Sequence, residues 1–177
     1  MLDDFFWRAL LGGIGVALLA GAAGAIVDLA DAGWTLVVVT NQAGVARGAF
    51  TEEDIVAVNA RVEACIEQDA GRCPIDHWYH CPYHPDGPIA QWTADHDWRK
   101  PRPGMLLAAS KELDIDLEAS WMIGDQDRDI EAGIAAGCRT IWLTAADRTN
   151  DRVEPTAFAP SLVEASQLVL AAAEAGV

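Results

Sequence analysis

Residues 37–48 read V-V-V-T-N-Q-A-G-V-A-R-G, and this stretch decides the fold class. Its β-branched apolar start is typical of a strand that is buried on both faces. The apolar run stops at Thr40, Asn41 and Gln42, where polar side chains and glycines take over. A buried strand of this kind predicts a parallel sheet, and ligands bind such sheets beyond the carboxyl ends of the strands.

Outward from this strand, helix and strand patterns alternate. Ile26–Ala32 has the pattern of a helix that ends at Gly33, and T-E-E-D at residues 51–54 has the form of a capping box that opens a helix reaching about Asp69. This alternation predicts an α/β fold, a Rossmann-like parallel sheet with helices on both faces. The other expected elements are strands over Thr35–Thr40, Ile75–His80, Trp121–Ile123 and Arg139–Thr144, and helices from Pro103 to just before Ile115, over Asp127–Ala136 and from Ser161 onward.

Composition and charge restrict the classes of partner. The chain has 177 residues, enough for one domain with a sizeable core, and its 51% hydrophobic and 22% charged content is globular. A net charge of −15 disfavours nucleic acid and anionic membranes, although a small anionic substrate remains open where the few cations cluster. Four cysteines are too few for a disulfide scaffold, so we expect a cytoplasmic protein. We also expect it to act as a monomer.

The N-terminal part differs from the rest. Residues 9–27 carry no charge and are rich in Gly, Ala and Leu. This apolar stretch is about long enough to cross a bilayer. A buried helix leading into the first strand is the favoured interpretation, and attachment to a membrane is the alternative. We therefore divide the chain into an apolar segment, residues 1–24, and a domain over residues 25–177.

Three polar clusters lie at predicted strand ends or in neighbouring loops. They are T-N-Q at residues 40–42, R-K-P-R-P-G at residues 99–104 and G-D-Q-D-R-D at residues 124–129. Taken singly, they could be a strand end, surface charge and a helix cap. Together they supply a hydroxyl, cations and carboxylates, which can hold a phosphate beside a divalent metal ion.

Four stretches carry a resemblance to a known family. They are L-V-V-V-T-N-Q-A-G-V-A-R-G-A-F-T-E-E-D, H-C-P-Y-H-P-D-G, R-K-P-R-P-G-M-L-L and S-W-M-I-G-D-Q-D-R-D-I-E-A-G-I-A-A-G-C-R-T. With them the sequence from about Ala25 onward resembles the haloacid dehalogenase superfamily of phosphatases. Within it, the sequence is most similar to the D-glycero-D-manno-heptose 1,7-bisphosphate phosphatases and the related histidinol-phosphate phosphatases.

The resemblance implies a mechanism and a set of residue roles. An aspartate attacks phosphorus to form an aspartyl-phosphate, while Mg²⁺ and fixed cations neutralise the phosphoryl oxygens. Gln126 stands where the bisphosphatases often carry Lys, which puts one substrate contact in doubt. The implied roles are catalysis for Thr40 and Lys100, substrate binding for Asn41, Gln42, Ala43, Arg99 and Gln126, and magnesium binding for Asp125 and Asp129.

One departure from the family concerns zinc. Many of these phosphatases hold structural zinc through a Cys-x-His pair and a later Cys-x-Cys pair. Here Cys81 is kept, His84 stands one residue late, and His96 is a substitute at the second pair. These three residues could be the remains of a zinc site. The interpretation that this loop packs Trp92 and Trp98 without metal is favoured, and we expect no bound zinc.

The second departure concerns the nucleophile. The family requires an early strand that ends in Asp-x-Asp, and none precedes Thr40 in this sequence; Asp3 and Asp4 occur in M-L-D-D-F-F instead. Residues 1–21 resemble the start of a zinc-uptake ABC transporter permease. We therefore expect a heptose 1,7-bisphosphate-type phosphatase that is inactive as written. The alternatives are a histidinol-phosphate phosphatase, a non-catalytic sugar-phosphate-binding module and a membrane-attached fragment.

Overall fold

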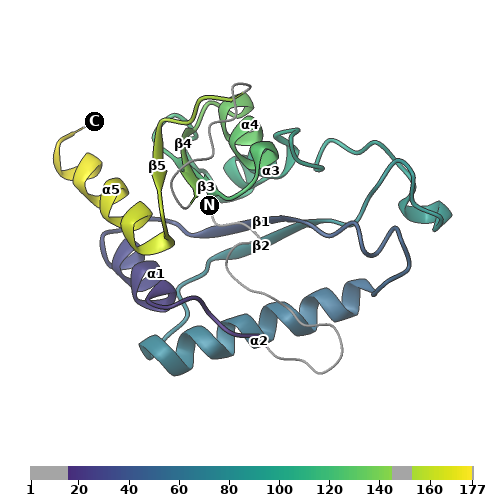
Figure 1. Ribbon diagram of the computed structural model, residues 1–177, viewed down its shortest axis with the longest axis horizontal. Coiled ribbons are helices and arrows are strands. Elements are labelled where there is room, and N and C mark those ends of the chain that lie inside the picture. Colours follow the sequence, from purple (N-terminus) through teal and green to yellow (C-terminus); the bar gives the residue numbers. More distant parts are fainter. Residues whose placement is uncertain (1–15, 145–152, 177) are drawn as a thin grey trace.

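The computed structural model describes residues 16–144 and 153–176. Its strands are all parallel and form two groups (Figure 1). One group pairs β1 (Val37–Asn41) with β2 (His77–Cys81), in a register that places Thr40 opposite His80. The other group has the order β3 (Trp121–Gly124), β4 (Arg139–Leu143) and β5 (Ala157–Ala159). The predicted α/β class with parallel strands is confirmed.

Helices cover both faces of the strands, as predicted. Side chains alternate between the two faces of β1, so that Val38 packs with α2 and Val37 and Val39 pack with α3. The α-helices are α1 (Ala22–Asp31), α2 (Glu52–Ala70), α3 (Gly104–Leu113), α4 (Asp127–Ala135) and α5 (Leu162–Glu174), with a short 3₁₀-helix η2 (Ala90–Trp92) between β2 and α3.

The local signals that end α1 and begin α2 act as the sequence predicts. The Thr51 hydroxyl accepts a hydrogen bond from the Asp54 N–H at 3.2 Å, and the Asp54 carboxylate accepts one from the Thr51 N–H at 2.8 Å. The capping box is therefore confirmed. Gly33 follows α1 with a φ of 90°, a left-handed conformation that favours glycine.

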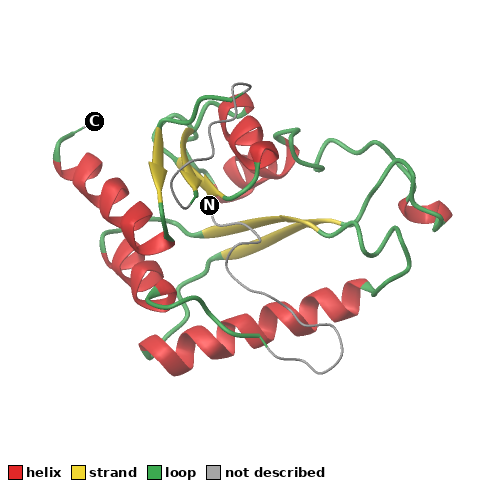
Figure 2. Ribbon diagram, viewed as in Figure 1, coloured by secondary structure: helices red, strands yellow, loops and turns green. Residues whose placement is uncertain are grey.

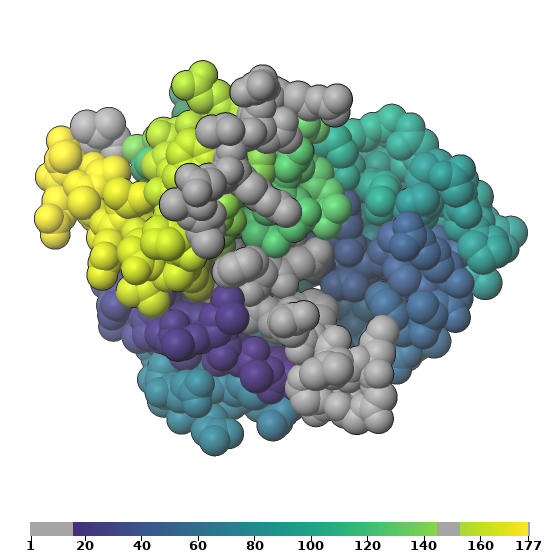
Figure 3. All heavy atoms as spheres, viewed as in Figure 1, coloured from purple at the N-terminus to yellow at the C-terminus, as the bar shows by residue number. Residues whose placement is uncertain are grey.

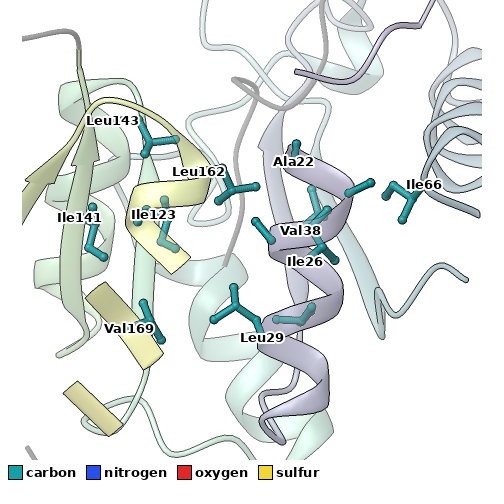
Figure 4. Close-up of a cluster of buried hydrophobic side chains, with 14 of the residues drawn as sticks. Ala22, Ile26, Leu29, Val38, Ile66, Ile123, Ile141, Leu143, Leu162 and Val169 are labelled. Carbon is teal, nitrogen blue, oxygen red and sulfur yellow. The ribbon is translucent and has the colours of Figure 1, made fainter. Parts of the chain in front are cut away.

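One hydrophobic cluster joins the two strand groups through side chains. Figure 4 shows Val38 from β1 and Ile123 from β3 in this cluster, together with Ile26 from α1 and Leu162 from α5. All of these side chains are almost fully buried. Burial of this apolar surface therefore stabilises the arrangement of the two groups.

The two strand groups meet along a seam between β1 and β3. In the part of the chain that the structure describes, no backbone ladder joins these strands, so the strands form a two-stranded and a three-stranded group, drawn in yellow in Figure 2. A cavity of about 40 Å³ lies at this seam, lined on one side by Val37 and on the other by Trp121 and Ile123.

The described end of the apolar N-terminal segment belongs to this core. Val16, Ala22 and Ala23 are buried in the same cluster, and α1 begins at Ala22, four residues before the predicted helix pattern. Of the membrane-attachment candidate, residues 9–15 lie outside the described residues. No helix in residues 16–144 or 153–176 is long and apolar enough to span a bilayer.

Candidate active site

Two strand ends and one loop bring the three polar clusters together. Thr40 is the fourth residue of β1, and Asp125 directly follows β3. Lys100 connects β1 with the start of α4 from the loop before α3: its ammonium donates to the Val39 carbonyl at 2.8 Å and lies 3.0 Å from a carboxylate oxygen of Asp129. The Lys100 and Asp129 side chains are 1% and 0% exposed, so this is a buried ion pair.

The polar residues after β1 hold Lys100 and Thr40 in place. The Asn41 amide donates to the Lys100 carbonyl at 3.1 Å and accepts from the Lys100 N–H at 3.0 Å. Gln42 donates from its side chain to the Thr40 hydroxyl oxygen at 3.1 Å. Asn41 is thus a positioning residue for the lysine. Ala43 lies in the following turn, where its carbonyl accepts from the Arg47 N–H.

Asp129 has two structural contacts in addition to its predicted role. One carboxylate oxygen pairs with Lys100, and the other accepts from the Gln126 N–H at 2.9 Å, which closes a capping box at the start of α4. A Cβ on Gly124 would lie 2.4 Å from the Asp129 Cβ, so only glycine lets the carboxylate approach the strand this closely. Asp129 is therefore placed to hold Lys100 more directly than to bind a metal ion.

Asp125 has the oxygen atom that suits a hard cation. Its Oδ2 accepts from the Gln126 side chain at 2.7 Å, and the Trp142 indole donates to its backbone carbonyl at 3.2 Å. Its Oδ1 is buried and has no hydrogen-bond donor among the described residues. A buried carboxylate oxygen without a donor is costly unless a cation binds it. Mg²⁺ is held in many proteins by one or two carboxylates together with substrate phosphate and water, so Asp125 fits this ion.

Two further arginines, Arg47 and Arg128, lie near Arg99. The guanidinium of Arg99 donates to the Tyr83 carbonyl at 3.4 Å. The guanidinium of Arg47 lies 3.4 Å from Nε2 of His84, the residue that follows Tyr83. Burial lowers the pKa of Arg99, and the nearby charges of Arg128 and Arg47 lower it further. Sequence analysis singled out Arg99 alone, because Arg47 and Arg128 are far from it in the chain.

The three zinc candidates make other contacts. Cys81 is fully buried among apolar side chains, and burial raises the pKa of its thiol. His96 stacks on Tyr83 with ring centroids 4.3 Å apart, and His84 accepts from the Asp86 N–H. In the described part of the chain, no three His, Cys, Asp or Glu residues are grouped as a metal site.

The chain is similar in sequence and in fold to phosphatases of known structure. A HAD-hydrolase-like family model matches residues 97–166. The crystal structure of D,D-heptose 1,7-bisphosphate phosphatase from B. bronchiseptica, complexed with magnesium and phosphate, superposes with a TM-score of 0.77, at 27% identity and over 96% of both chains. A putative HAD-like phosphatase from Mesorhizobium loti superposes with a TM-score of 0.76 at 30% identity, over 95% of this chain and 85% of the other. The fold is thus that of a HAD-like phosphatase.

Relatives with similar sequences identify the family within the HAD-like phosphatases. D-glycero-alpha-D-manno-heptose-1,7-bisphosphate 7-phosphatase of Burkholderia mallei is 40% identical over 145 residues, which is 82% of this chain and 72% of the relative. D-glycero-beta-D-manno-heptose-1,7-bisphosphate 7-phosphatase of Yersinia pestis is 43% identical over 68% of this chain, but the match spans only 63% of the relative's length. The chain belongs to the heptose-1,7-bisphosphate 7-phosphatase family.

Proposed function

We propose that the site around Lys100 binds the phosphate group of a sugar-phosphate monoester of the heptose 1,7-bisphosphate type. The observation that carries this proposal is the position of the Lys100 ammonium, fixed by Val39 and Asp129 where β1 and β3 end. A compact ammonium held beside a strand-end hydroxyl is suited to phosphoryl oxygens. The family membership supports the same substrate class.

Each residue has a separate task in this proposal. Lys100 neutralises charge on the phosphoryl oxygens, and Thr40 donates its hydroxyl to one of them. Asn41 keeps the backbone of Lys100 in register with β1. Asp125 would hold Mg²⁺, which when bound supplies further positive charge to the transferring phosphoryl group. Arg99, next to Lys100 in the chain, would contact a second phosphate of the same molecule, and Gln126 and Ala43 complete the proposed set.

Turnover requires a nucleophile that the sequence upstream of Thr40 does not supply in the family's form. We therefore propose that the chain as written binds the ester and does not hydrolyse it. The experiment compares phosphate release from the heptose bisphosphate and from histidinol phosphate by three proteins: the unmodified chain, Asp3→Asn, and a version whose N-terminal segment is replaced by a strand ending in Asp-x-Asp-Gly.

The outcomes separate the alternatives. Magnesium-dependent release by the grafted protein alone supports the proposal, and the preferred ester identifies the substrate. Turnover by the unmodified chain that is lost in Asp3→Asn would show that Asp3 is the nucleophile. Phosphate binding without turnover in any version, measured by titration calorimetry, would favour a non-catalytic binding module.

The cellular setting is also a proposal. We propose a cytoplasmic protein that acts as a monomer on a small anionic substrate. All four cysteines lie in the described residues and none forms a disulfide, which suits a reducing compartment. Fractionation and sedimentation of the full chain test these two statements, and recovery in membranes would favour attachment through residues 9–27.

A further inference from the structure

A hollow of about 520 Å³ lies beside the end of β2, outside the set of residues around Lys100. This is within the usual volume of a small-molecule site. Most of its wall comes from the segment between β2 and α3, which extends beyond the carboxyl ends of β1 and β2 (Figure 1). In the space-filling view the same segment, coloured teal, forms one end of the molecule (Figure 3). The segment is thus a separate feature of the surface.

Aromatic rings form the walls of this hollow and hold one another in fixed orientations. Tyr83 stacks on His96 with an interplanar angle of 5° and meets the edge of Trp92 at 68°. His96 in turn meets Trp98 at 85°, and its Nδ1 accepts from the Trp98 N–H. Rings held at right angles to each other present both faces and edges to a ligand. The hollow therefore has rigid apolar walls.

Polar groups on the same walls point to a ligand rich in hydroxyl groups. Glu52 and His80 lie 3.2 Å apart and line the hollow, with side chains 41% and 24% exposed. Trp92, Trp98 and Tyr83 add two indole N–H groups and a phenol hydroxyl to the residues that line the hollow. The hollow thus offers donors and acceptors together with aromatic faces.

We infer that this hollow binds an uncharged carbohydrate ring. Aromatic faces pack against the C–H face of a sugar, while Glu52, His80 and the indole N–H groups can bond its hydroxyls. No Lys or Arg lines the hollow, and Glu52 and the net charge of −15 oppose an anion. An organic cation would suit the carboxylate, but it would give the indole donors no acceptor. This inference does not depend on the phosphate site.

The test is a titration of the full chain followed by ¹H–¹⁵N spectra of the tryptophan indoles. The probes are mannose, galactose, choline and inorganic phosphate. We expect at least one of the sugars to shift the Trp92 and Trp98 signals saturably, with no effect of choline or phosphate on them. The signal of Trp78, whose N–H donates to Glu63 outside the hollow, should stay in place.

Variants distinguish the hollow from other surfaces. Trp92→Ala should abolish the sugar-induced shift of Trp98, and Glu52→Gln, which keeps the shape, should weaken sugar binding several-fold. Phe158→Ala changes another half-exposed aromatic side chain, on β5, and should leave binding unchanged. A saturating concentration of inorganic phosphate should also leave sugar binding unchanged, which separates this site from the phosphate site.

Two results would overturn the inference. One is that neither mannose nor galactose shifts the Trp92 and Trp98 signals saturably, whether or not choline does. The other is a sugar-induced shift that Trp92→Ala and Glu52→Gln both leave intact.

Discussion

The buried pair of Lys100 and Asp129 makes a prediction that a double-mutant cycle can test. Lys100→Met removes the ammonium and leaves the Asp129 carboxylate, which is 0% exposed, without the charge that pairs with it. Breaking one side of a buried pair costs about 3–5 kcal/mol of unfolding free energy. Asp129→Asn leaves the Lys100 ammonium buried, and we expect a loss of similar size.

The double variant should lose much less than the sum of the two single variants. With both charges gone, the main remaining cost is the Val39 carbonyl, which loses the Lys100 donor; such a loss is about 1–3 kcal/mol. Asn at position 129 keeps an oxygen that can accept from the Gln126 N–H and so preserve the start of α4. The coupling free energy between Lys100 and Asp129 should therefore stabilise the folded state by several kcal/mol. This is well above the deviation of about 0.5 kcal/mol that independent sites show.

Urea unfolding followed by tryptophan fluorescence measures these differences. Lys111→Met is the matched control, because Lys111 is exposed on α3, and it should change the unfolding free energy by less than about 0.5 kcal/mol. If the double variant loses the sum of the single losses, the two groups do not act as a pair, and the geometry proposed for the phosphate site is wrong.

Three further predictions concern metal content, a helix cap and pH. The purified protein should hold no stoichiometric zinc, since Cys81 faces the core; elemental analysis showing about one zinc per chain, lost in Cys81→Ser, would contradict this. Thr51→Ala should cost about 1 kcal/mol in urea unfolding because it removes the hydroxyl that accepts from the Asp54 N–H, and Thr51→Ser should cost less. Burial, and then the hydrogen bond to Glu112, raises the pKa of Tyr79 from 10 to about 12, so its phenol favours the folded state below pH 10 and this contribution is lost as the pH rises towards 12. Unfolding measured at rising alkaline pH should therefore show a smaller loss for Tyr79→Phe than for the unmodified chain.

The sequence predicted those parts of the fold whose signals are local. Apolar runs predicted β1 and β3, and T-E-E-D predicted the start of α2, because each signal lies within a few adjacent residues. β5 was not predicted: its three residues, Ala157–Ala159, have no strand pattern of their own and are ordered by pairing with β4. The sequence predicted a buried helix that ends before Gly33 but not the residue at which α1 starts, because the run before Ile26 is apolar on all sides.

The candidate site was predicted in its membership but not in its contacts. Lys100 and Asp129 were expected in one site, yet their ion pair and the contact of Asn41 with Lys100 join residues far apart in the chain. The role of Asp129 in holding Lys100 also depends on this packing. Arg47 was missed for the same reason, and Arg128 was given no role although it lies in the G-D-Q-D-R-D cluster.

The seam between β1 and β3 divides the phosphate site between two bodies. Thr40 belongs to the body of β1 and β2, whereas Asp125 and Asp129 belong to the body of β3, β4 and β5. Side-chain packing and the Lys100–Asp129 pair connect these bodies in the described structure. A small rigid-body displacement across the seam would separate the hydroxyl from the carboxylates without unfolding either body. Substitutions in the apolar cluster that spans the seam, far from any ligand, would then weaken phosphate binding by shifting Thr40 relative to Asp125.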